Sequence, residues 1–100
     1  MVSSDFGRTP RYNDGMGKDH WPITSVLMMG GGVQGNRVIG ATDDGVYALP
    51  VNSQTLELDP TGEKIQPAHL HASLRARFGV NEHRLSAHYP ILSDPLPIFG

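Results

Sequence analysis

The sequence predicts an α/β fold in which a partial parallel sheet is accompanied by small β-hairpins and one main helix. Residues 23–31 (ITSVLMMGG) form a continuous apolar run that ends in glycine, which is typical of a strand buried on both faces in a parallel sheet. Turn signals at 43–45 and 59–62 each separate two short β-type runs and predict two hairpins. Residues 67–79 carry helix signals at both ends.

The helix signals are the most specific of the three. Pro67 suits the first helical position, and Gly79 suits the position just after the last turn, in which two arginines complement the helix dipole. An apolar stripe at helical spacing should face the core, and it consists of Leu70, His71, Leu74 and Phe78. We therefore expect His71 to be a core or interface histidine.

The chain divides into four consecutive segments of one unit, residues 1–100. Residues 1–51 should supply the strands and a polar loop, residues 52–66 a hairpin, residues 67–79 the helix, and residues 80–100 an irregular, proline-punctuated tail. The strand-like start MVSS runs into an acidic residue without any lead-in. We therefore expect this chain to be a fragment of a larger domain.

Composition excludes several classes of protein. The formal charge of −2 and the pI of about 6.2 provide no basic field for nucleic acid. Without cysteine there are no disulfides, and any metal must be held by carboxylate, imidazole or backbone oxygen. No apolar run approaches the ~20 residues of a membrane span, and the first residues lack the pattern of a signal peptide. These absences do not identify the cellular compartment of the protein.

Asp19 and His20 are the sharpest candidates for chemistry. Adjacent carboxylate and imidazole groups on a loop that enters a strand can reach one divalent ion, and Asp5 at the end of the preceding strand could add an oxygen. The alternative is structural: Asp19 caps a turn and Trp21 anchors it. Both interpretations follow from the residue pattern.

Arg8 and Arg11 are the candidates for anion binding, because guanidinium groups bind phosphate, sulfate or carboxylate with two hydrogen bonds. Alternatively they are solvated or pair with Asp5 or Asp14. The glycines at 30–32 lack the following Lys-Ser or Lys-Thr of a phosphate-binding loop and should form a turn. No serine lies in a nucleophile context, so the sequence predicts no catalytic residue.

Several strings together resemble a bacterial family. SDFGRTPRYNDGMGKDHWP, SVLMMGGGVQGNRVIGATDD, QPAHLHASLRARFGV and YPILSDPLPIF closely resemble the end of the domain of unknown function 1501 family, an uncharacterised group. The resemblance covers nearly the whole chain. That family is similar in fold to the alkaline phosphatase and sulfatase superfamily, which implies that this chain is a C-terminal fragment of an alkaline phosphatase-like sandwich.

The resemblance also implies site roles. In that superfamily two divalent metals lie at the carboxyl ends of central strands, held by an Asp-His pair after one strand and a further His before the next. By position Asp5 matches the Asp of the pair, Phe6 stands where its His would be, and His20 resembles the later ligand. Family members usually carry Glu at the position of Asp5 and Arg at that of Lys18.

The function that follows is metal-assisted binding or hydrolysis of a phosphate or sulfate ester by the parent protein. In the superfamily the nucleophile comes from the N-terminal half of the domain, which this chain lacks. That half is the main partner expected for the chain, and the fragment alone should be inactive. Family resemblance implies a twin-arginine signal upstream and export to the periplasm. The alternatives are a non-catalytic exported binding protein that retains the fold, as Phe6 suggests, and a self-contained β-rich interaction module.

Overall fold

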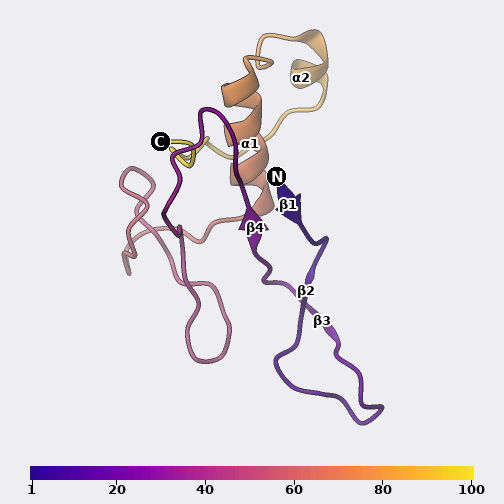
Figure 1. Cartoon of the computed structure of the whole chain (residues 1–100). Coiled ribbons are helices and arrows are strands. Elements are labelled where there is room, and N and C mark those ends of the chain that lie inside the picture. Colours follow the sequence, from indigo (N-terminus) through magenta and orange to yellow (C-terminus); the bar gives the residue numbers. More distant parts are fainter.

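A long antiparallel hairpin occupies the N-terminal quarter of the chain in the computed structural model, which describes residues 1–100 (Figure 1). Its inner ladder joins β1 (Val2–Ser3) to β4 (Val26–Leu27). Its outer ladder joins β2 (Gly7–Arg8) to β3 (His20–Trp21). The two arms therefore run side by side, and the hairpin projects away from the helices.

Asn13 organises the tip of this hairpin. Its side-chain oxygen accepts hydrogen bonds from the backbone N–H groups of Gly15 and Gly17, each at 3.0 Å. Its backbone N–H donates to the Gly17 carbonyl at 2.8 Å, and its carbonyl accepts from the N–H of Met16 at 3.0 Å. Asparagine favours such turns because its side chain mimics a backbone acceptor. The tip of the hairpin is thus the polar loop expected within residues 1–51.

Gly7 allows the two arms to approach closely. It lies opposite Trp21, and a Cβ atom at position 7 would overlap the backbone carbonyl of Ile23. Any larger residue would force the arms apart. The register of the outer ladder thus depends on one glycine.

The strands differ from the expected parallel sheet, because both ladders are antiparallel. The apolar run 23–31 contributes only the two residues of β4, and both are exposed. Parallel neighbours need a crossover of a dozen or more residues, usually a helix. Here the intervening segment folds straight back as a hairpin, so the two strands of each ladder run in opposite directions.

Val51 lies at the centre of the second β-type region. It forms antiparallel bridges with both Leu58 and Glu63, and its side chain is fully buried. The turn at 59–62 is present, since the N–H of Gly62 donates to the carbonyl of Asp59 at 2.9 Å. Its two flanks pair with residue 51 rather than with each other, so the expected hairpin becomes a three-segment arrangement.

The smaller turn at 43–45 is also present. The N–H of Val46 donates to the carbonyl of Asp43 at 2.9 Å, and Thr42 bridges Ala48 in antiparallel fashion. The Asp43 carboxylate accepts from the N–H groups of Gly45 and Tyr47 at 2.9 and 3.0 Å. One acidic side chain therefore satisfies the donors of the turn.

α1 (Pro67–Phe78) confirms the predicted helix. Pro67 stands at the first helical position, where its missing N–H costs nothing. Gly79 adopts the left-handed conformation with φ of 66°, and its N–H donates to the Ala76 carbonyl at 3.2 Å. Glycine carries little penalty for this conformation, which explains why the helix ends here.

The buried face of α1 is not the apolar stripe expected from the sequence. The buried residues are His69, Ala72 and Ser73, whereas His71 is exposed and Phe78 is 73% exposed. The expectation that His71 lies in the core is therefore wrong for this chain. Polar contacts from two other segments, described below, decide which face is covered.

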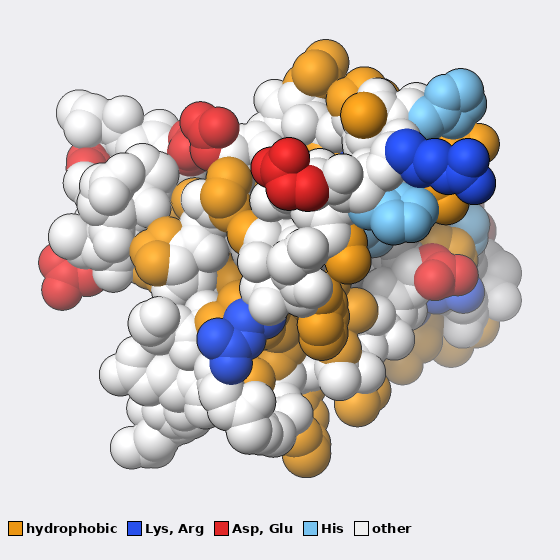
Figure 2. Space-filling view, turned by 90° about the horizontal axis from the view of Figure 1, so that it is seen from above, with side chains coloured by type: hydrophobic (Ala, Val, Ile, Leu, Met, Phe, Trp, Pro, Cys, Tyr) orange, Lys and Arg blue, Asp and Glu red, His pale blue; other side chains and the backbone are white.

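The core is small and lies beside α1. Only 7 of the 100 residues are buried, so most apolar side chains reach the surface. The buried cluster consists of Leu56, Leu96 and Ile98, against which Met28, Ile39, Ile65, Leu70 and Phe99 pack. Figure 2 accordingly shows hydrophobic side chains exposed between polar groups and backbone on one face.

α2 (Arg84–His88) is a short helix after α1 that buries none of its residues. The His83 ring caps its start by accepting the Leu85 N–H at 3.1 Å, and Arg75 of α1 donates to the Tyr89 carbonyl at 2.6 Å. Arg75 also donates to the Ser86 carbonyl within α2 at 3.4 Å, so its guanidinium joins the two helices. Neither helix has the length and apolar character needed to cross a membrane.

Candidate functional site

Phe6, Arg8 and His20 form one exposed cluster on the N-terminal hairpin. Arg8 and His20 are cross-strand partners, so their side chains project from the same face. The rings of Phe6 and His20 stack with centroids 3.7 Å apart and planes inclined by 24°. The Arg8 guanidinium lies 5.0 Å from the Phe6 ring centroid. The cluster thus presents an imidazole and a guanidinium on one aromatic base.

The two candidate anion-binding arginines have different surroundings. One guanidinium nitrogen of Arg8 donates to the Lys18 carbonyl at 3.0 Å, which fixes the side chain across the hairpin. Arg11 is exposed near the tip, and its backbone carbonyl accepts from the Thr9 hydroxyl at 2.8 Å. The Arg8 and Arg11 side chains share no hydrogen-bond partner, so the structure does not combine them into one anion site.

The chain's single ion-pair contact joins His69 and Glu63. The alternative in which Arg8 or Arg11 pairs with Asp5 or Asp14 is therefore not found.

Asp19 holds the hairpin together. Its carboxylate accepts from the Asn13 side-chain amide at 3.0 Å, and its N–H donates to the Thr9 hydroxyl at 3.1 Å. Its carbonyl accepts from the Thr9 N–H at 3.0 Å. This is the structural role that the sequence left open for Asp19.

Trp21 anchors the hairpin to the 43–47 turn. Its indole N–H donates to the Val46 carbonyl at 2.8 Å, and its ring lies 5.1 Å from that of Tyr47. The anchoring role that the sequence suggested for Trp21 is therefore present.

The three candidate metal ligands do not converge within this chain. Asp19 extends the ladder next to His20, and consecutive side chains on extended backbone point to opposite faces. Asp5 is exposed at a bend between β1 and β2. The chain contains no group of three or more His, Asp or Glu side chains placed to hold one metal ion. A metal role for these residues stays a prediction that depends on ligands from outside the chain.

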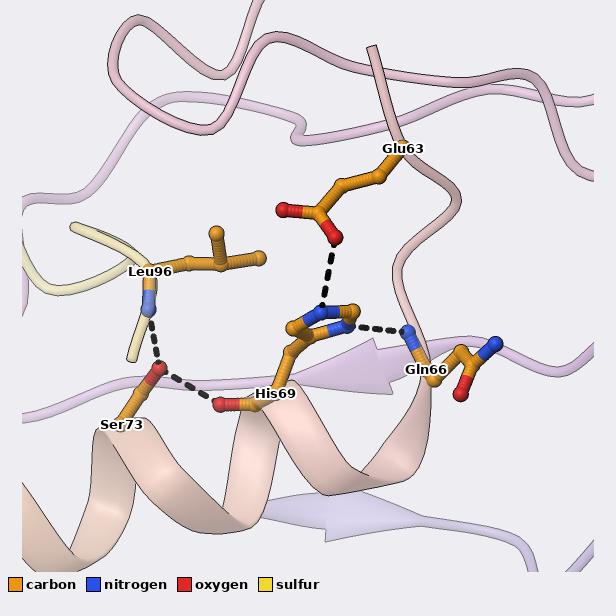
Figure 3. A network of polar contacts seen from close by, with 5 residues as sticks. All are labelled: Glu63, Gln66, His69, Ser73 and Leu96. Atoms are coloured by element: carbon orange, nitrogen blue, oxygen red, sulfur yellow. Dashed lines mark hydrogen bonds and ion pairs between the residues drawn. The ribbon is translucent and has the colours of Figure 1, made fainter. Parts of the chain in front are cut away.

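A second polar cluster, which the sequence did not predict, surrounds the start of α1 (Figure 3). The His69 ring is buried, and its Nδ1 atom accepts the Gln66 N–H at 3.0 Å. Its Nε2 atom lies 3.3 Å from a carboxylate oxygen of Glu63. Because Nδ1 is an acceptor, the neutral ring carries its proton on Nε2 and donates it to Glu63.

Ser73 continues this cluster into the C-terminal tail. Its hydroxyl donates to the His69 carbonyl at 2.7 Å and accepts the Leu96 N–H at 2.8 Å, as Figure 3 shows. Both interactions are buried, and no buried side-chain polar atom in the chain lacks a partner. One helix face therefore joins the segment before α1 to the tail through polar groups.

A local signal could have identified His69. It occupies the third helical position after Gln66, where the side chain of a capping-box residue reaches back to the N-cap N–H. Pro67 at the first position fixes this numbering. The apolar-stripe argument passed over His69 because it counted only apolar neighbours.

The Asp59 carboxyl group accepts several hydrogen bonds at the 59–62 turn. Its pKa is lowered from the ordinary value by hydrogen bonds from the Thr61 backbone N–H, then from the Thr61 hydroxyl, then from the Asn52 amide. The Thr61 bonds are 2.9 and 2.8 Å long. These donors favour the ionised form and stabilise the turn at 59–62.

The fold and the clusters define a mixed chain of antiparallel ribbons and helices, with an exposed cation–aromatic cluster and a buried polar one. The chain belongs to the family described as "Protein of unknown function (DUF1501)", which matches residues 1–92. The family resemblance noted in the sequence is therefore confirmed. Neither the curated proteins nor the solved structures contain a match to this chain.

Proposed function

We propose that this chain is the C-terminal part of an alkaline phosphatase-like domain, and that the whole domain binds or hydrolyses a phosphate or sulfate ester with a divalent metal. The observation that carries the proposal is the cross-strand pairing of Arg8 and His20 on one exposed face. A guanidinium suits an oxyanion, and an imidazole suits a divalent metal. The small core supports a missing remainder of the domain, because many apolar side chains lack cover.

The roles divide among the hairpin residues. Arg8 would bind the anionic group while its bond to the Lys18 carbonyl keeps the guanidinium in place. His20 would be a metal ligand, with Asp5 and Asp19 nearby and other ligands from the rest of the domain. Metal would then neutralise the ester oxygens and activate the attacking group. The fragment by itself would bind but not turn over substrate.

The test uses a longer family member that includes this segment. The protein should contain stoichiometric metal and hydrolyse an aryl phosphate or aryl sulfate. His20→Ala should lower the metal content, whereas His71→Ala, which removes an exposed helical histidine, should leave it unchanged. Arg8→Ala should weaken ester binding about tenfold or more at unchanged metal content, because a charge-assisted hydrogen bond is worth ~1.5–3 kcal/mol. Full metal retention by His20→Ala would contradict the ligand role.

A second candidate is a non-catalytic binding protein that kept the fold, and Phe6 favours it. Phe6 stands where the superfamily carries a histidine ligand, and its ring is already occupied in stacking on His20. A hydrocarbon ring offers no metal lone pair. Such a protein would bind an anionic ligand through Arg8 without chemistry at the metal.

Substitution at position 6 separates the two candidates in the longer protein. If the chemistry was lost through Phe6, Phe6→His should raise the metal stoichiometry, and the matched apolar change Phe6→Leu should not. If the unmodified protein already contains its full metal and hydrolyses either aryl ester, the binding-only candidate is wrong. Metal analysis and the two ester assays therefore suffice.

A further inference from the structure

We propose that His69 is a pH-sensitive latch that closes the start of α1 at neutral pH and opens it on protonation. The inference is independent of the ester-binding function, because it rests on the buried cluster of Figure 3 rather than on the exposed hairpin. The buried ring has a different partner on each nitrogen: the Gln66 N–H faces Nδ1, and the Glu63 carboxylate faces Nε2. The two contacts respond in opposite ways to a proton.

Protonation removes the acceptor that holds the helix start. The imidazolium ring carries a hydrogen on both nitrogens, so Nδ1–H would point at the N–H of Gln66 across a 3.0 Å contact. Two donors cannot share that contact, and Gln66 must turn away from the ring. The N-cap N–H then loses its partner, while the charged Nε2–H strengthens its bond to Glu63.

The groups facing His69 from each packed segment set this balance. The segment before α1 contributes Glu63, which favours the imidazolium and whose carboxylate is about half exposed. α1 contributes the positive end of its dipole, which disfavours the positively charged imidazolium. The tail contributes Leu96, an apolar residue whose N–H is bound to Ser73. Protonation of the ring therefore exchanges the contact with the Gln66 N–H for a stronger contact with the Glu63 carboxylate.

The connection between α1 and the tail should survive this change. Ser73 binds the backbone carbonyl of His69 rather than its ring, so the bond between the Leu96 N–H and the Ser73 hydroxyl does not depend on the ring proton. Opening is thus confined to the first turn of α1 and the 63–66 segment. The Leu96 amide provides an internal reference for the rest of the fold.

NMR of the full chain at pH 8 and pH 5 tests the latch. At pH 8 the ¹⁵N shifts of the His69 ring should show Nδ1 as the acceptor and Nε2 as protonated. The protection factor of the Gln66 amide should fall at least tenfold at pH 5, while that of Leu96 changes little. The control is His69→Gln, because glutamine at the third helical position accepts the N-cap N–H without titrating. Its Gln66 protection should be the same at both pH values.

Three results from the protection factors would overturn the proposal. They are an unchanged Gln66 protection factor in the unmodified chain, an equal loss in His69→Gln, and a parallel loss at Leu96 that reveals general unfolding. The ring shifts are measured on the unmodified chain, so they test the latch even if His69→Gln folds poorly. A ring with Nδ1 protonated at pH 8 contradicts the latch. Glu63→Gln, which removes the attraction for the imidazolium, should move the opening to lower pH.

Discussion

The N-terminal hairpin and the region from Val51 to Ile98 use the same antiparallel pairing but bury their side chains very differently. Val2 and Leu27 face each other across the inner ladder and are 62% and 55% exposed. Val51, also at the centre of antiparallel bridges, is 0% exposed. Strand pairing fixes the path of a chain, whereas burial requires a further layer against the paired strands. The helix and tail supply that layer only in the second region.

Truncation of the core should produce the largest effect and should be felt only in the second region. Leu96→Ala removes a side chain that is 5% exposed and packs with Leu56 and Ile98. We expect a loss of about 2–5 kcal/mol in the free energy of unfolding, measured by denaturant titration. Leu92→Ala, at a site 97% exposed, should change it by less than about 0.5 kcal/mol. Equal losses would mean that the core does not stabilise this region.

A smaller, local effect should follow from adding a side chain where the two arms of the hairpin meet. Gly7→Ala places a methyl group onto the Ile23 carbonyl and should cost about 1–3 kcal/mol through overpacking. NMR should show the loss of the β2–β3 ladder with the Leu96 amide unchanged. Gly17→Ala is the matched control, because a Cβ there meets the Asn13 side chain at an ordinary 3.6 Å. Disruption of α1 by Gly7→Ala would show that the two regions are coupled.

The smallest effect concerns the turn at Asp59, and it depends on pH. Since the folded pKa of Asp59 is lowered, the ionised carboxylate adds stability above its ordinary pKa, and that stability is lost as pH falls through the folded pKa. Below about pH 4, unfolding midpoints of the unmodified chain should therefore fall more steeply than those of Asp59→Asn. Thr61→Val, which removes the hydroxyl donor, should give an intermediate slope. Identical slopes in all three would contradict the assignment.

Local signals predicted the local structure well. Pro67 and Gly79 mark the ends of α1, and the turns at Asn13 and at 59–62 form where their residues indicate. Each of these features depends on neighbours within a few residues, so sequence spacing contains the necessary information. The antiparallel direction of the N-terminal ladders was missed, because an apolar run fits a strand of either direction.

The sequence indicated the candidate residues but not how their side chains are arranged. The sequence identified Asp19, His20 and Arg8 as notable, and the structure places Arg8 and His20 on one face. It places Asp19 in the hairpin's own hydrogen bonds. Adjacency in sequence suggested convergence of Asp19 and His20, but extended backbone turns neighbouring side chains to opposite faces. Whether a segment is extended depends on its partner strand, which the dipeptide alone does not specify.

By itself the sequence determined where α1 begins and ends, where the chain turns, and which family it belongs to. Only the tertiary structure decided which histidine of α1 is buried. His69 and His71 lie two residues apart, and the apolar stripe favoured His71. The structure instead gathers Gln66, Glu63 and the Ser73 link to the tail on the side of His69. The physical reason is that a buried polar residue needs hydrogen-bond partners, and the tail, which lies 23 residues beyond Ser73, covers this side of the helix only in the folded chain.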